Sequence, residues 1–242
     1  MENFRNTEEL LAWVINFFAE EFGNNAIIRG GMALRLLNSP RYTNDIDYIF
    51  IPFRSKKDIK PLIEKKMSSV KGLDFAITLN SKALVVNICY LSQSCQAEIS
   101  VENKCLSLPM SSSAIASQYG LPAKIVRIVE LSTAFAHKIA AWNERELLRD
   151  LFDVYQYKTI LKIEPNAEVL QKRLAKPRNY PNVKSARNLN ELREKLLTAA
   201  NGLNEQNIYD ELSPLLPETE LAGLHLRIAA AMRGTVENID GG

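Results

Sequence analysis

The sequence predicts an α+β protein in which a mixed β-sheet flanked by helices precedes a C-terminal helical bundle. Between residues 26 and 101, short apolar runs are separated by turns and by amphipathic stretches. Beyond Lys124, apolar residues recur almost throughout at helical spacing. A segment at 109–123 that is rich in Ser, Pro and Gly lies between these patterns. It predicts two domains, residues 1–108 and 109–242, the second completing the functional site of the first.

The expected N-terminal domain begins with a helix over about 7–22, capped by Asn6 with Glu9 reaching back. Two more helices are expected, over about 32–38 and 56–70. The predicted strands lie at about 26–29, 44–51, 74–79, 83–91 and 95–101.

Four helices are expected in the C-terminal domain, at about 132–142, 143–161, 190–200 and 218–233. Two of them are predicted to begin at capping boxes, which start at Asn143 and Asn188.

Composition narrows the classes of function. The net charge of +2 gives no global preference for polyanions, so a nucleic-acid surface would have to be local. The two histidines supply a Ser-His-Asp triad or a His-rich zinc site poorly. Three cysteines without metal-ligand spacing indicate reduced thiols in a cytoplasmic protein. Residues 1–6 lack signal-peptide features, and no run of 18 apolar residues occurs, so no membrane association is expected.

Asp45 and Asp47 are the first candidate site residues. Strand alternation places both carboxylates on one face, with α-carbons about 6.6 Å apart. Gly30 and Gly31 follow the preceding strand and would bare backbone N–H groups for a phosphate. Together they predict a magnesium–nucleotide site. The structural alternative is a tight glycine turn, with Asp45 in a turn and Asp47 paired with an arginine such as Arg29 or Arg41.

Glu98 lies in a later predicted strand between apolar neighbours. If that strand is next to the strand of Asp45 and Asp47, three carboxylates would gather as metal ligands and hold two Mg²⁺ about 3.5–4 Å apart. The alternative is an exposed glutamate on an edge strand.

Lys138, Asp150 and Asp153 are candidates in the helical domain. Lys138 would bind the triphosphate as a point charge, and Asp150 would orient Lys138 or the nucleoside. The alternative is a solvated helix face on which Arg149 pairs with Asp153.

Residues 169–190 contain six cations, one tyrosine and no acidic residue. This composition suits contact with a phosphate backbone and base stacking, but it equally suits a solvated basic loop.

In their order along the chain, these motifs resemble the nucleotidyltransferase-fold family of AbiEii/AbiGii toxins, the toxin halves of bacterial phage-defence and toxin–antitoxin pairs. The resemblance covers about residues 26–160 and rests on five elements: Ile28–Leu34 with its two glycines, Arg41-Tyr42-Thr43, Asp45-Ile46-Asp47, Glu98, and Lys138 with Arg149-Asp150-Leu151-Phe152-Asp153. Arg29 stands where an apolar residue is commoner in the family.

The resemblance implies a nucleotidyltransferase that moves a nucleoside monophosphate from an NTP to an acceptor hydroxyl with Mg²⁺. The implied catalytic residues are Asp45, Asp47, Lys138 and Asp150; the nucleotide would be bound by Gly30, Gly31, Lys138 and Asp153, and the metal by Asp45, Asp47 and Glu98. In relatives the acceptor can be the 3′ end of tRNA, and a cognate antitoxin would be encoded nearby. Two alternatives stay open: transfer to a small molecule or a protein, and a catalytically silent module that binds a nucleotide or a partner.

Overall fold

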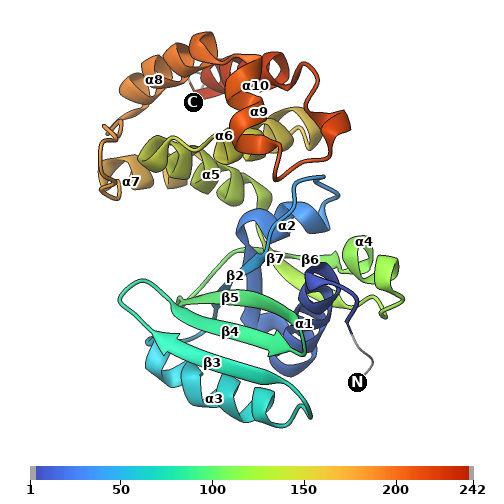
Figure 1. Ribbon diagram of the computed structural model, residues 1–242. Helices are drawn as coiled ribbons and strands as arrows, with labels where there is room; N and C mark the ends of the chain where they lie inside the picture. The colour runs from blue at the N-terminus through green and yellow to red at the C-terminus, as the bar shows by residue number, and fades with distance from the viewer. Residues whose placement is uncertain (1–3, 240–242) are drawn as a thin grey trace. The chain divides into compact units, whose positions relative to one another are not determined.

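Strands of the N-terminal half form one seven-stranded mixed sheet in the order β3-β4-β5-β2-β1-β7-β6 (Figure 1). The computed structural model describes residues 4–239. The expectation about signal-peptide features concerned residues 1–6, of which 1–3 lie outside the described residues. The chain divides after Glu130 into two compact units. The strands are β1 (Ala26–Arg29), β2 (Asp45–Phe50), β3 (Asp74–Leu79), β4 (Leu84–Tyr90), β5 (Gln93–Val101), β6 (Ser107–Ser111) and β7 (Ile125–Val129).

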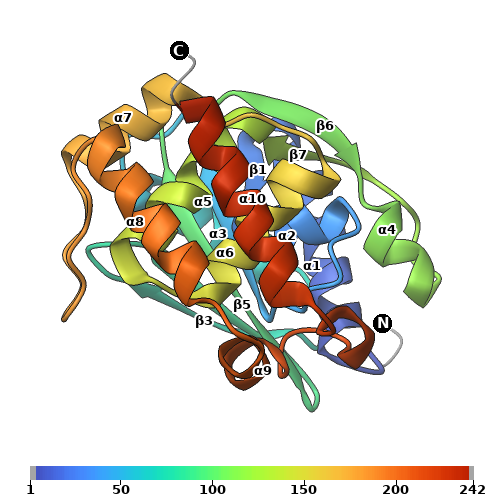
Figure 2. The same cartoon turned by 90° about the horizontal axis from the view of Figure 1, so that it is seen from above.

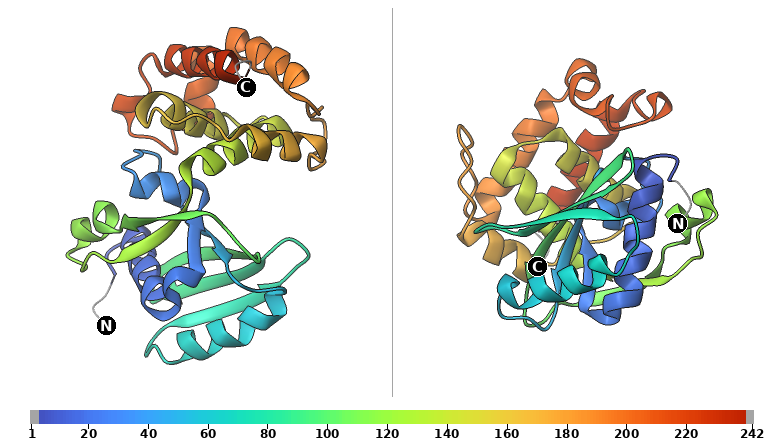
Figure 3. Two further views of the ribbon diagram at one scale, coloured as in Figure 1. Left: turned by 180° about the vertical axis from the view of Figure 1, so that it is seen from behind. Right: turned by 60° about the horizontal axis from the view of Figure 1, so that its bottom comes forward.

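Four α-helices accompany the sheet, and α1 and α3 lie along it in Figure 3. The Asn6 side chain accepts a hydrogen bond from the Glu9 amide at the start of α1, as its sequence predicted, but the Glu9 carboxylate accepts from the amide of Arg5 and does not complete a capping box with Asn6. The helical elements of this unit are α1 (Thr7–Phe22), η1 (Gly23–Asn25), α2 (Gly30–Leu36), α3 (Lys56–Ser68), α4 (Ser113–Ala116) and η2 (Ser117–Tyr119).

The core of this unit lies between the sheet and α1. Phe18 of α1 stacks on Tyr48 with ring centroids 4.9 Å apart, and Phe22 meets Phe50 edge-on at 5.0 Å. Because side chains alternate along a strand, packing Tyr48 and Phe50 against α1 turns Asp45 and Asp47 to the opposite face of β2. The buried side of the strand thereby determines where its carboxylates lie.

The division after Glu130 differs from the boundary expected at residue 108 because β6 and β7 belong to the sheet. β7 runs parallel to β1, and β6 pairs with β7 at the edge. Pro109 lies in β6, and an edge strand tolerates proline because one side of it needs no backbone donor. The Ser- and Pro-rich composition that indicated a linker therefore marks an edge strand and the connection that follows it.

The second unit is helical throughout the described residues 131–239, as expected, and α8 and α10 lie side by side in it (Figure 2). Among the described residues, every helix is too short or too polar to cross a membrane. The helices are α5 (Leu131–Arg145), α6 (Leu148–Tyr155), the π-helical η3 (Gln156–Ile160), α7 (Ala167–Ala175), α8 (Leu189–Gly202), α9 (Glu205–Leu212), η4 (Glu218–Glu220) and α10 (Leu224–Ile239).

Several helix boundaries of the second unit differ from the sequence expectation, and α7 and α9 were not predicted. Asn143 does not start a helix, because α5 continues to Arg145. Its side chain instead donates to the carbonyl of Ala186 at 2.9 Å and accepts from the Ala186 amide at 2.8 Å. The last helix begins at Leu224 and extends to Ile239, beyond the expected stop at residue 233. At Asn143, the long-range hydrogen bonds with Ala186 therefore replace the helix cap that the local pattern predicted.

Candidate functional site

An acidic face, which we define as Asp45, Asp47 and Glu98, lies where β2 and β5 run parallel. Asp47 is the register partner of Glu98, and Asp45 is the partner of Gln96. Register partners on neighbouring strands project to the same face of a sheet. The condition set by the sequence is met, since the strand of Glu98 is next to the strand that carries the two aspartates.

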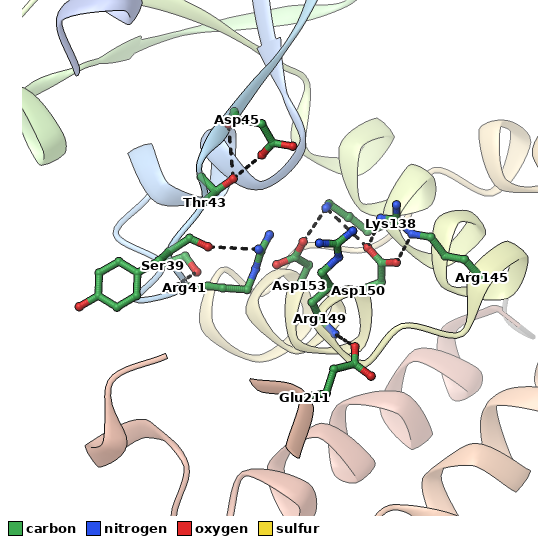
Figure 4. Close-up of polar contacts among 11 residues, drawn as sticks. Ser39, Arg41, Thr43, Asp45, Lys138, Arg145, Arg149, Asp150, Asp153 and Glu211 are labelled. Atoms are coloured by element: carbon green, nitrogen blue, oxygen red, sulfur yellow. Dashed lines mark hydrogen bonds and ion pairs between the residues drawn. The ribbon is translucent and has the colours of Figure 1, made fainter. Parts of the chain in front are cut away.

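Neutral side chains hold two of these carboxylates. The Thr43 hydroxyl donates to Oδ1 of Asp45 at 2.5 Å (Figure 4), and Nε2 of Gln96 donates to Oε1 of Glu98 at 2.9 Å. Arg29 is the register partner of Asp47 across β1 and β2. The threonine of the Arg-x-Thr element therefore has a positional role: it orients the first carboxylate of the acidic face.

Negative charge accumulates on the acidic face. Burial raises the pKa of Glu98, and the nearby charges of Asp47 and Asp45 raise it further. The hydrogen bond from Gln96 and the charge of Arg29 act in the opposite direction without cancelling the rise in pKa. A site that disfavours its own ionised carboxylate attracts a cation or a proton.

Gly30 and Gly31 both make close approaches that a side chain would prevent. Gly30 has a φ of +73°, and a Cβ atom there would collide with the carboxylate of Asp47. At Gly31, a Cβ atom would lie 2.5 Å from Nη2 of Arg41. Gly30 therefore allows a left-handed turn and also leaves space for the carboxylate of Asp47, so its structural role and its proposed role in the site are compatible.

The described residues include no group of three or more His, Cys, Asp or Glu side chains arranged to hold a metal ion. The three-carboxylate metal cluster expected from the sequence is therefore not formed as such, although its members share one face. The donor set still fits a hard divalent cation, because carboxylate oxygens are the ligands that Mg²⁺ prefers.

A buried ion cluster, which we define as Lys138, Arg145, Asp150 and Asp153, lies in the helical unit (Figure 4). Nζ of Lys138 lies 2.5 Å from Oδ2 of Asp153 and 3.8 Å from Oδ1 of Asp150. Arg145 donates from Nε and Nη2 to the two oxygens of Asp150 at 2.6 and 2.7 Å. Both aspartate side chains are 0% exposed, so this helix face is not solvated as the structural alternative supposed.

Arg145 is a member of this cluster that the sequence analysis missed. It lies seven residues after Lys138, which is two helical turns and hence the same face of α5. Burial lowers the pKa of the Arg145 guanidinium, but the hydrogen bond and charge of Asp150 outweigh burial and raise it overall. Arg149, the alternative partner considered for Asp153, is exposed.

Comparison with known proteins shows which family the sequence matches and which solved structures have a similar fold. Residues 14–231 match the family described as "Nucleotidyl transferase AbiEii toxin, Type IV TA system". The fold is similar to that of MenT4, a nucleotidyltransferase toxin of Mycobacterium tuberculosis H37Rv, with a TM-score of 0.61 and 16% identity over 96% of this chain and 82% of that one. It is also similar to JHP933 of Helicobacter pylori, with a TM-score of 0.53 and 13% identity over 97% and 91% of the two chains. No curated protein matches the sequence significantly.

Proposed function

The chain belongs to the AbiEii nucleotidyl transferase toxin family, and on this premise we propose that it transfers a nucleoside monophosphate from an NTP, with Mg²⁺, to a hydroxyl group of RNA, with the 3′ end of tRNA as the first candidate. The membership confirms the resemblance predicted from the ordered motifs. Nucleotidyl transfer is the activity of the family; the metal, the acceptor and the residue roles are our proposal.

The acidic face is the observation that carries the proposal. Asp45, Asp47 and Glu98 offer several carboxylate oxygens on one side of the sheet, and burial and mutual repulsion raise the pKa of Glu98. These three residues would hold the metal. When bound, Mg²⁺ would neutralise charge on the triphosphate and make the acceptor hydroxyl easier to deprotonate.

Binding of the triphosphate is assigned to the glycine turn and to Lys138. Gly30 and Gly31 begin α2, and a helix start of this kind directs backbone N–H groups at an anion. Lys138 is held by Asp153 and Asp150, and an ammonium group has three donors. One of these donors is within hydrogen-bond distance of Asp153, whereas Asp150 is near enough only for a charge interaction, so a further donor would bind a phosphate oxygen.

In the proposed reaction, the acceptor oxygen attacks the α-phosphorus of the NTP. A new phosphorus–oxygen bond forms, the bond from the α-phosphorus to the bridging oxygen breaks, and pyrophosphate leaves. The hydroxyl proton passes to a carboxylate oxygen of the acidic face. Asp150 and Asp153 position the Lys138 ammonium throughout.

The test is a labelling assay with each of the four NTPs, Mg²⁺ and total tRNA. The wild-type protein is expected to label RNA, and Asp47→Ala is expected to abolish labelling because it removes a proposed metal ligand. Asp74→Ala, an exposed aspartate on β3, is the matched control and should label as the wild type does. Label that persists in Asp47→Ala would refute the assignment, and label on protein or a small product would redirect the acceptor.

Lys138 needs a charge-balanced test because its loss alone would strand a buried aspartate. Lys138→Gln combined with Asp153→Asn removes one cation and one anion together. Loss of labelling in a variant that unfolds at the wild-type temperature supports a role in binding the triphosphate, and wild-type labelling contradicts it.

A cognate antitoxin, a role in phage defence and a cytoplasmic location are further parts of the proposal. Induced expression of the wild-type chain should arrest bacterial growth, whereas Asp47→Ala should not. Coexpression of a small neighbouring gene should restore growth. Equal arrest by both forms would show that toxicity does not depend on nucleotidyl transfer.

A further inference from the structure

The segment between α7 and α8 exposes a group of cations without ion-pair partners. No acidic side chain of the described residues 4–239 pairs with any of them, and the sequence contains no acidic residue from 169 to 190. The two preceding cations differ, because Lys172 pairs with Glu168 at 2.5 Å and Arg173 pairs with Glu144 at 2.6 Å. The group, which we call the basic loop, comprises Lys176, Arg178, Lys184 and Arg187.

Both ends of the basic loop are fixed to the C-terminal end of α5. The amide of Arg178 donates to Oε1 of Glu144 at 3.2 Å, and Ala186 exchanges two hydrogen bonds with the side chain of Asn143. Nζ of Lys195 also donates to the carbonyl of Lys184 at 2.9 Å. The cations are therefore presented from a held backbone, and binding a ligand there costs less ordering entropy than on a mobile loop.

The attachment points place the basic loop beside the buried ion cluster of the same unit. Asn143 and Glu144 immediately precede Arg145, whose guanidinium holds Asp150. Tyr180, half-buried in the loop, lies near enough to Arg145 that its charge contributes to raising the pKa of that guanidinium. A polymer bound along the loop would thus lie close to the Arg145 end of the buried ion cluster within this unit.

A cavity of about 1410 Å³ is lined in part by residues of this segment, and the charge of its lining disfavours a polyanion inside it. Its lining contains three cations, of which Lys184 and Arg187 belong to the basic loop, and more numerous carboxylates, those of Glu146, Glu191, Glu194, Asp210 and Glu211. An anionic backbone is repelled from such a lining. Lys176 and Arg178 are not part of this lining, and all four loop cations are exposed, so a backbone could follow the loop without entering the cavity.

We propose that the basic loop is a binding site for the phosphodiester backbone of a single-stranded polynucleotide, with Tyr180 as a stacking surface for one base. Four exposed cations and one tyrosine in the same segment are the chemistry that such a ligand requires. As the site that holds the acceptor RNA, this inference rests on the proposed function; as a binding site, it is tested independently of transfer.

The experiment measures binding of a fluorescein-labelled single-stranded RNA to the full chain by fluorescence anisotropy at several salt concentrations. The test variant changes all four loop cations to glutamine, and these side chains are exposed and form no ion pair with the described residues. Its control carries the same change in charge on unpaired, exposed cations of the N-terminal unit: Arg54→Gln, Lys57→Gln, Lys65→Gln and Lys71→Gln.

A plot of log affinity against log salt concentration has a negative slope, and each phosphate contact to a single strand contributes about 0.7 to its magnitude. Because the loop variant lacks four cations, we expect the magnitude of its slope to be smaller than that of the wild type by about three. Between about 50 and 200 mM salt, wild-type affinity should then fall about 50-fold more than that of the loop variant. The control variant should behave as the wild type. Equal binding by the loop variant, or an equal loss in the control, would overturn the inference.

The labelling assay separates this inference from the proposed function. The loop variant should raise the KM for RNA while leaving kcat near the wild-type value, whereas Asp47→Ala should bind RNA normally and transfer nothing. If the wild type labels no RNA but binds it through the loop, the proposed function fails and the binding site stands. If the wild type labels RNA and the loop variant has an unchanged KM, the reverse holds.

Discussion

Asp47 and Glu98 are register partners on the parallel strands β2 and β5, so two carboxyl groups from distant parts of the sequence share one face of the sheet. Burial and the charges of Asp47 and Asp45 together raise the pKa of Glu98. The acidic face therefore stores electrostatic repulsion in the folded protein, and the first prediction measures it.

Glu98→Gln should increase thermal stability at neutral pH in the absence of divalent metal. A carboxyl group whose pKa is raised by folding destabilises the folded state once ionised, and this penalty grows as pH rises through its folded pKa. Below the unfolded pKa of about 4.5 the penalty vanishes, because the group is protonated in both states.

Thermal unfolding from about pH 4 to 8 checks this prediction. The Tm of Glu98→Gln should exceed that of the wild type by an amount that increases with pH. For Glu218→Gln, at an exposed position, the difference in Tm from the wild type should not change with pH. A pH-independent difference would mean that repulsion on the acidic face is not its source. The same Glu98→Gln variant should be inactive in the labelling assay, since it removes a proposed metal ligand.

Gly30→Ala should cost both stability and activity. The left-handed backbone costs a residue with a Cβ atom about 1–2 kcal/mol, and the new methyl group would also displace the Asp47 carboxylate. Gly120→Ala isolates the first effect, because Gly120 has a φ of +71° and open space where its Cβ atom would lie.

Chemical denaturation and the labelling assay compare the two glycine variants. Gly120→Ala should lose only the backbone contribution and keep full activity. Gly30→Ala should lose more stability and most of its transfer. Full activity in Gly30→Ala would show that the close approach to Asp47 is not required.

Arg145→Ala should destabilise the helical unit strongly. It leaves Asp150 buried without its bidentate partner, and breaking a buried pair on one side costs about 3–5 kcal/mol. Adding Asp150→Asn to Arg145→Ala should recover much of this loss, because it removes the uncompensated charge.

A double-mutant cycle in urea measures the coupling between Arg145 and Asp150. Arg149→Ala, at an exposed position of α6, is the control and should change stability by less than about 0.5 kcal/mol. Additive losses from the two cluster substitutions would contradict a direct interaction.

Asn143→Ala should loosen the basic loop. Its side chain satisfies both backbone groups of Ala186, and each buried group left unpaired costs about 1–3 kcal/mol. Hydrogen exchange at residues 178–187 should accelerate relative to wild type, while exchange in α10 stays unchanged. Unaltered protection of the loop would show that other contacts hold it.

The strands and α-helices between residues 7 and 101 could be predicted from local sequence pattern. Helix α1 spans the predicted range Thr7–Phe22 and begins at the predicted cap, because capping and helical periodicity depend on residues within one or two turns. The same applies to β2, whose alternation placed Asp45 and Asp47 on one face. The Asp-x-Asp element and the glycine pair were thereby identified as candidate site residues from sequence alone.

β6 was missed for a physical reason, whereas β7 is a mostly β-branched run, Ile125–Val129, that the sequence analysis wrongly included in the helical region. Ser107–Ser111 contains Pro109 and few apolar residues, and it becomes a strand only because β7 offers a partner at the edge of the sheet. Asn143 shows the reverse case, since its capping pattern is overridden by a contact with Ala186. Pairing across long sequence separations leaves no mark in local periodicity.

The sequence by itself determined the α+β class, the glycine turn, the acidic pair and the family resemblance, because each depends on neighbouring residues and their spacing. Only the tertiary structure decided that Glu98 lies beside Asp47 and that Arg145 holds Asp150. It also decided that the basic loop is fixed to the end of α5. These relationships follow from strand order and helix packing, which bring together side chains whose separation along the chain carries no periodic pattern.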